Sequence, residues 1–122
     1  MKILIATDGT QHSREALEAI FTINLADGDE IKVLSVVDMA IPLPVDLYGG
    51  FLPATNEIET AVRENAAKTV EEAALYLREK IANDKIFITT ETLSGSPESR
   101  IVESAEQMKA DIIIVGSHGY NR

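Results

Sequence analysis

Two glycines and an acidic residue stand directly after apolar runs of the sequence. Gly116 and Gly119 follow the run Ile112-Ile113-Ile114-Val115 in a Gly-x-x-Gly pattern, and Asp8 follows the first apolar run, residues 2–7. Paired glycines let a backbone approach a phosphate closely, with its N–H groups as donors. A carboxylate at a strand end accepts a hydrogen bond from a ribose hydroxyl. These residue types therefore suit the binding of a phosphorylated ligand.

Each of these residues also has a plain structural interpretation. A turn after a strand needs glycine in any case, and Asp8 is equally suited to capping the turn that follows it. The stretch Gly95-Ser96-Pro97-Glu98 resembles a phosphate loop, but a helix start is the better interpretation, with Ser96 as N-cap and Pro97 at the first helical position.

No catalytic or metal-binding motif is recognisable in the sequence. It contains no cysteine, which excludes disulfides and thiolate chemistry. Its two histidines, His12 and His118, have no partners at metal-ligand spacing. Neither a G-x-S-x-G elbow nor a Walker loop occurs. We therefore expect a binding protein rather than an enzyme.

Composition indicates one soluble domain. The chain has 122 residues, 45% of them hydrophobic and 25% charged, which is enough for a single core. A net charge of -9 argues against nucleic acid or an anionic membrane surface as a partner, but not against a nucleotide. No apolar run approaches the ~20 residues of a membrane span, and the apolar run at residues 3–6 is too short for the hydrophobic region of a signal peptide. We expect a cytoplasmic protein.

Alternating strands and helices must position the candidate residues. Apolar runs predict strands at residues 2–7, 31–37, 85–93 and 112–115. Helical periodicity predicts helices from about residue 13 to residue 26, from an N-cap at Asn56 to residue 81, and from Pro97 to Met108. This alternation predicts an α/β fold, a doubly wound parallel sheet with helices on both faces.

The elements are expected to differ in burial. The run at 112–115 predicts a strand buried on both faces, whereas the mixed run at 85–93 predicts an edge strand with one wetter face. In the helix after Pro97, the buried stripe is expected to consist of Ile101, Val102, Ala105 and Met108.

Residues 39–54 contain three prolines and two adjacent glycines, which predicts a long loop. It is either a binding loop or a segment that covers the protein's own surface.

In a doubly wound sheet, ligands bind at the carboxyl ends of the strands, where the strand order reverses. If the first and fourth strands are neighbours, Asp8 and Gly116 face each other across a crevice. The end of the second strand, Val36-Val37-Asp38, then supplies an apolar wall for a flat base.

Together, these segments resemble the universal stress protein family across essentially the whole chain. The resemblance rests on residues 3–10 with Ser13 and Ala16 behind them, on residues 33–38, on Gly95-Ser96-Pro97 and on residues 110–119. It implies a parallel sheet of order 3-2-1-4-5 with helices on both faces, and homodimers. The present chain supplies the order 3-2-1-4.

The resemblance also implies ATP, bound with Mg²⁺, between the first and fourth strands. Any hydrolysis is expected to be slow. The alternative is a member that binds no nucleotide and acts through dimerisation and protein contacts. A phosphoacceptor domain fits less well, because the third strand does not end in an acceptor aspartate, and a flavin-binding domain fits less well, because no aromatic pair frames an isoalloxazine. Carried over by motif, the adenine and ribose contacts are Ala6, Thr7, Asp8 and Val37, and the phosphate loop begins with Gly116, His118 and Gly119.

The chain departs from the family pattern near its last residue. In the ATP-binding branch, the Gly-x-x-Gly is followed by nine residues, a third Gly and a Ser or Thr, but this sequence stops at Arg122. The family's last helix and fifth strand are missing as well. We therefore expect residues 1–122 to be a single universal stress protein domain, incomplete at its C-terminus. Because a bare strand at 112–115 is an aggregation hazard, we expect a second copy of the chain or a further tail to cover it.

Overall fold

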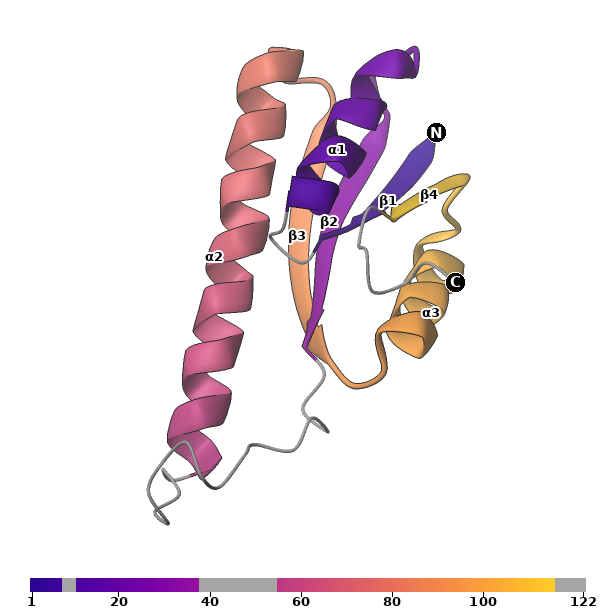
Figure 1. The fold of residues 1–122 in the computed structure, drawn as a ribbon. Coiled ribbons are helices and arrows are strands. Elements are labelled where there is room, and N and C mark those ends of the chain that lie inside the picture. The colour runs from indigo at the N-terminus through magenta and orange to yellow at the C-terminus, as the bar shows by residue number, and fades with distance from the viewer. Residues whose placement is uncertain (8–10, 38–54, 116–122) are drawn as a thin grey trace.

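The computed structural model describes residues 1–7, 11–37 and 55–115, with side chains from residue 14 in the first helix and from residue 60 in the second. Strands and helices alternate along the chain (Figure 1). Their order is β1 (Lys2–Ala6), α1 (Gln11–Ala19) continued by the 3-10 turn η1 (Ile20–Thr22), β2 (Glu30–Val37), α2 (Thr55–Ile81), β3 (Phe87–Ser94), α3 (Pro97–Met108) and β4 (Ile112–Val115). The predicted loop at 39–54 lies outside the described residues.

The four strands form one parallel sheet of order β3-β2-β1-β4. In the register, Leu4 of β1 lies between Lys32 of β2 and Ile113 of β4. This arrangement confirms the predicted doubly wound sheet, with the first and fourth strands as neighbours.

Two apolar clusters cover the two faces of the sheet. Successive strand residues point to opposite faces, so Ile3 and Ile5 pack into one cluster and Leu4 and Ala6 into the other. The first cluster includes side chains of α1, η1 and α2, and the second includes Ile101 and Ala105 of α3. Helices therefore lie on both faces, as predicted, with α1 and α2 on one side and α3 on the other (Figure 1).

Helix α2 packs along only part of its length. Its buried stripe of Ala66, Val70, Ala73 and Leu77 follows the predicted helical spacing. Val62, one helical turn before Ala66, is exposed, because the first turns of α2 extend past the ends of the strands (Figure 1). The predicted N-cap at Asn56 is wrong, since the helix already includes Thr55. None of the described helices combines the length and the apolar character that crossing a membrane requires.

Helix α3 begins as predicted but presents a different stripe. Ser96 occupies the N-cap position with extended backbone, and Pro97 is the first helical residue. Val102, predicted to be buried, is 52% exposed. Ser104 is buried in its place because the helix is turned so that Ile101 and Ala105 centre the contact with the sheet.

The two edge strands differ in how well the sequence predicted their burial. β3 is an edge strand, as predicted, and its burial pattern is mixed. β4 is also an edge strand, and the prediction that it is buried on both faces is wrong. Ile113 and Val115 are 47% and 41% exposed, because α3 crosses the other three strands and no other described helix lies on that face.

Candidate functional site

The carboxyl ends of β1 and β4 lie side by side. Ala6, the last residue of β1, is paired with Val115, the last residue of β4. The connection from β1 to β2 runs through α1 on one face, and the connection from β3 to β4 runs through α3 on the other. The strand order therefore reverses between β1 and β4, which is the position at which doubly wound sheets hold ligands.

Three of the predicted site residues lie within the described residues. Ala6 ends β1, Thr7 follows it directly, and Val37 ends β2; all three are buried at the carboxyl end of the sheet. The amide of Thr7 donates to the carbonyl of Leu34 at 2.8 Å, which extends the ladder between β1 and β2 by one residue. The other predicted site residues, Asp8, Gly116, His118 and Gly119, lie outside the described residues.

The end of β2 is paired to the turn that follows β3. Gly95 has a φ of +133°, a conformation that favours glycine. Its amide donates to the carbonyl of Val37 at 2.9 Å. Arg100 of α3 reaches back to this turn, where its Nε donates to the carbonyl of Ser94 at 2.9 Å, and its Nη1 lies 2.9 Å from Oε2 of Glu103.

Arg100 was not among the residues predicted from the sequence. Its only signal was its charge, since a cation in the first turns of a helix opposes the helix dipole and needs another partner. The carbonyl of Ser94 and the carboxylate of Glu103 are those partners.

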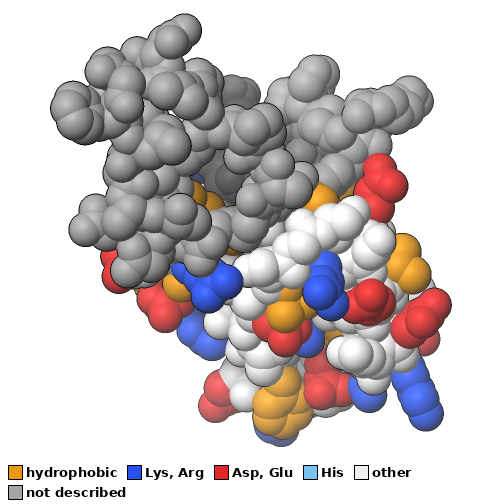
Figure 2. Space-filling view, turned by 90° about the horizontal axis from the view of Figure 1, so that it is seen from below, with side chains coloured by type: hydrophobic (Ala, Val, Ile, Leu, Met, Phe, Trp, Pro, Cys, Tyr) orange, Lys and Arg blue, Asp and Glu red, His pale blue; other side chains and the backbone are white. Residues whose placement is uncertain are grey.

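The described surface at the carboxyl ends of β2 and β3 carries charges of both signs (Figure 2). Figure 2 shows the molecule from the end at which β2 and β3 finish, and its described surface carries interspersed acidic and basic side chains. Among the described residues, no three His, Cys, Asp or Glu side chains are grouped so that they could hold a metal ion. The described part of the site consists of two buried apolar residues, Ala6 and Val37, and the buried polar residue Thr7.

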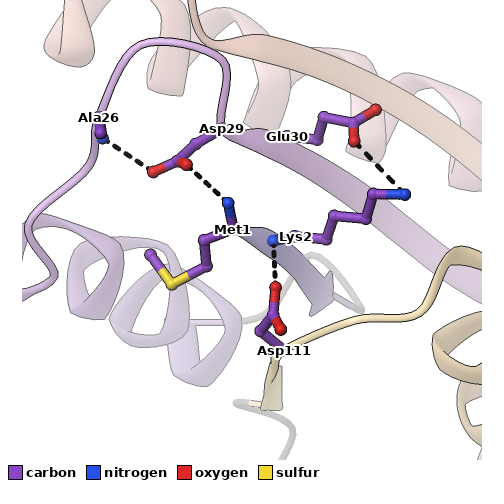
Figure 3. A network of polar contacts seen from close by, with 6 residues as sticks. All are labelled: Met1, Lys2, Ala26, Asp29, Glu30 and Asp111. Atoms are coloured by element: carbon purple, nitrogen blue, oxygen red, sulfur yellow. Dashed lines mark hydrogen bonds and ion pairs between the residues drawn. The ribbon is translucent and has the colours of Figure 1, made fainter.

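Among the described residues, the two groups with a clearly shifted pKa lie at the opposite end of the sheet (Figure 3). The amine of Met1 donates to Oδ1 of Asp29 at 2.8 Å, and Oδ2 of Asp29 accepts from the amide of Ala26 at 2.8 Å. The hydrogen bond from the amine, with that from Ala26, lowers the pKa of Asp29, and the same bond to Asp29 raises the pKa of the Met1 amine. Asp111 accepts from the amide of Lys2 at 2.7 Å. These contacts tie together the starts of β1, β2 and β4, far from the carboxyl ends.

A parallel sheet of this order, with its reversal between β1 and β4, defines the doubly wound class of α/β proteins. Within that class, the chain belongs to the universal stress protein family, whose pattern it matches over residues 1–122.

Individual relatives agree with this assignment. The chain is 34% identical to universal stress protein MJ0531 of Methanocaldococcus jannaschii, over 97% of this chain and 65% of the relative. It thus spans slightly under two thirds of that protein. The solved structure of MJ0577, from the same organism, has a TM-score of 0.73 and 27% identity, and the match covers 96% of this chain and 74% of that one.

Two further solved structures share the fold and contain nucleotides. One is a universal stress protein in complex with cAMP, with a TM-score of 0.62 and 20% identity over 100% of this chain and 80% of that one. The other is a family member from Arabidopsis thaliana with AMP bound, with a TM-score of 0.60 and 14% identity over 98% of this chain and 78% of that one. At these identities the likeness concerns the fold.

Proposed function

We propose that this protein is a stress-response module that binds an adenine nucleotide at the carboxyl ends of β1 and β4. The observation that carries the proposal is the pairing of Ala6 with Val115. It brings together the two strand ends from which Asp8 and the Gly116–Gly119 motif follow in the sequence. An acid for the ribose and a glycine pair for phosphate are thereby attached to neighbouring strands.

The fold supports this proposal. The cAMP and AMP complexes show that proteins of this fold accommodate adenine nucleotides. In this chain we assign the base and ribose to Ala6, Thr7, Asp8 and Val37. We assign the phosphates to Gly116, His118 and Gly119. Where ATP is the ligand, Mg²⁺ contributes by neutralising phosphate charge.

The protein acts by binding rather than by turnover. No general base is recognisable in the sequence near Asp8 and the Gly116–Gly119 motif. We therefore expect any hydrolysis of ATP to be slow. We assign it to the cytoplasm, as a response protein whose state follows the nucleotide supply.

Isothermal titration calorimetry with ATP and AMP, in the presence of Mg²⁺, tests this function. Asp8→Ala removes the ribose acceptor and should weaken the binding of both nucleotides by about tenfold to a hundredfold, because a hydrogen bond to a charged group contributes roughly 1.5–3 kcal/mol. Asp27→Ala removes an exposed carboxylate that pairs with Lys85 at 3.7 Å and should leave binding unchanged. Absence of binding heat and of a thermal shift with the unmodified chain would overturn the proposal.

A second candidate function, self-association and protein contacts without nucleotide, is favoured by the surface of β4. Ile113 and Val115 expose apolar side chains on an edge strand, and such strands pair readily with other chains. In this alternative, two copies meet at β4 to form a homodimer. Sedimentation velocity should show a dimer that the double change Ile113→Thr and Val115→Thr weakens. Leu75→Gln, at an exposed apolar site on α2, is the matched control. A monomer at all concentrations would exclude this function.

A further inference from the structure

Among the described residues, the last residues of β2 are paired only with β3. β1 pairs with β2 from Glu30 to Leu34, whereas β3 pairs with it from Glu30 to Val37. The single bond from Thr7 to Leu34 is the last contact of that ladder in the described residues. The position of Val37 therefore depends on the end of β3, where Ser94 is its register partner.

The end of β3 is in turn fixed by Arg100. Its Nε donates to the carbonyl of Ser94, and its Nη1 pairs with Glu103 on the same helix. The guanidinium also lies against the turn itself, since a Cβ placed on Gly95 would be 2.8 Å from Nε. Glycine is the most flexible residue, so a turn built on it needs such an external restraint to keep one conformation.

We infer that Arg100 is a positioning residue of the nucleotide site and sets the wall against which the base packs. The contacts run from Glu103 to Arg100, from Arg100 to Ser94, and from the Ser94–Gly95 turn to Val37. This inference rests on the proposed function, in which Val37 contacts the base. The guanidinium is partly exposed and its pair with Glu103 is a surface pair, so it contributes little to global stability. Its contribution is to the geometry of one strand end.

A ligand series separates positioning from simple attraction of an anion. If Arg100 positions the wall against which the base packs, Arg100→Ala should lower the affinities for AMP and ATP by the same factor, about threefold to tenfold. If Arg100 acted through its charge, the affinity for ATP would fall more than the affinity for AMP, because ATP carries more negative charge. Arg100→Lys keeps the charge but loses the planar fork that holds two acceptors at once, so binding should stay weakened. Full recovery of binding in Arg100→Lys would overturn the inference.

Arg78 provides a matched control. Its Nη2 donates to the carbonyl of Ile88 at 3.0 Å, so it makes the same kind of bond to β3 near the other end of the strand. Arg78→Ala should leave the affinities for AMP and ATP unchanged. A loss as large as that in Arg100→Ala would show a general weakening of β3 and would overturn the inference.

Hydrogen exchange in the absence of ligand tests the restraint directly. The amide of Gly95 should exchange faster in Arg100→Ala than in the unmodified chain, and at the unmodified rate in Arg78→Ala. Unchanged exchange of Gly95 in Arg100→Ala overturns the inference even if nucleotide binds. Faster exchange together with no nucleotide binding by the unmodified chain supports the restraint on the turn and refutes the proposed function, so the two failures are distinguishable.

Discussion

At the scale of single residues, two glycines with positive φ differ in how much room surrounds the position that a Cβ would occupy. Gly95 has a φ of +133° and lies under Arg100, whereas Gly28 has a φ of +92° and no atom within 4 Å of the position that a Cβ would occupy. Alanine at Gly95 meets both backbone strain and a steric clash, but alanine at Gly28 meets strain alone. Space, rather than φ alone, therefore distinguishes the two turns.

We expect Gly95→Ala to lower the free energy of unfolding by about 2–3 kcal/mol and Gly28→Ala by about 1 kcal/mol. Urea unfolding followed by circular dichroism measures both. Equal losses in the two variants would show that Arg100 moves aside without cost. Combining Gly95→Ala with Arg100→Ala should recover part of the loss, because the clash is then absent while the strain remains.

The ion pair between Met1 and Asp29 makes stability depend on pH in two directions. The pKa of the Met1 amine is raised by the hydrogen bond to Asp29. The contribution of the charged amine to the stability of the fold is therefore complete below about pH 8 and is lost as the pH rises through the raised pKa. Because the pKa of Asp29 is lowered by the bonds from Met1 and Ala26, its contribution is complete above about pH 4 and is lost as the pH falls through the lowered value.

Asp29→Asn should therefore flatten the dependence of unfolding free energy on pH at both ends of the range. Chemical denaturation at a series of pH values, for the variant and the unmodified chain, measures the difference. Asp27→Asn, an exposed carboxylate near the same turn, should leave the curve almost unchanged. Parallel curves for Asp29→Asn and the unmodified chain would contradict the assignment.

At the scale of elements, helix α2 carries most of its stabilising contacts on one stripe. Leu77 is fully buried against the sheet, whereas Leu75, two residues earlier, is 62% exposed. Leu77→Ala leaves a cavity and should cost about 2–5 kcal/mol. Leu75→Ala should stay within about 0.5 kcal/mol of the unmodified chain.

Thermal and urea unfolding of this pair test whether α2 is docked as described. Comparable losses for both variants would mean that Leu75 also has a packing partner. The test also separates intrinsic helix propensity from packing, because both changes replace leucine by alanine in the same helix.

At the scale of the whole molecule, net charge opposes association through the exposed apolar surface. The chain carries a net charge of -9 at pH 7, and its isoelectric point is near 4.6. Repulsion between copies falls as the pH approaches that value. Association through the exposed Ile113 and Val115 of β4 is then less opposed by charge repulsion.

We expect self-association to increase as the pH is lowered from 7 toward 5, and Ile113→Thr with Val115→Thr to reduce the increase. Light scattering across this range, at fixed protein concentration, measures it. If association rises equally in the double variant, another surface is responsible, and the exposed Val102 on α3 is the next residue to change.

Much of the fold was predictable because its signals are local. Apolar runs bounded by turn residues predicted all four strands, and Gly95-Ser96-Pro97 predicted the start of α3. The neighbouring positions of β1 and β4 were expected from the alternation of elements and the family resemblance, and the structure confirms them. Of the predicted site residues, the structure describes Ala6, Thr7 and Val37, which are buried at the carboxyl end of the sheet. The roles of all site residues remain predictions.

The sequence by itself determined which segments are strands and helices, and which chemical groups follow the strand ends, because periodicity and turn chemistry depend on neighbours along the chain. Only the tertiary structure decided that β4 exposes Ile113 and Val115, that Ser104 rather than Val102 is buried, and that Arg100 restrains the end of β2 through Ser94 and Gly95. The physical reason is that burial and long-range hydrogen bonds depend on which element crosses which face of the sheet. That choice is made by packing among distant segments.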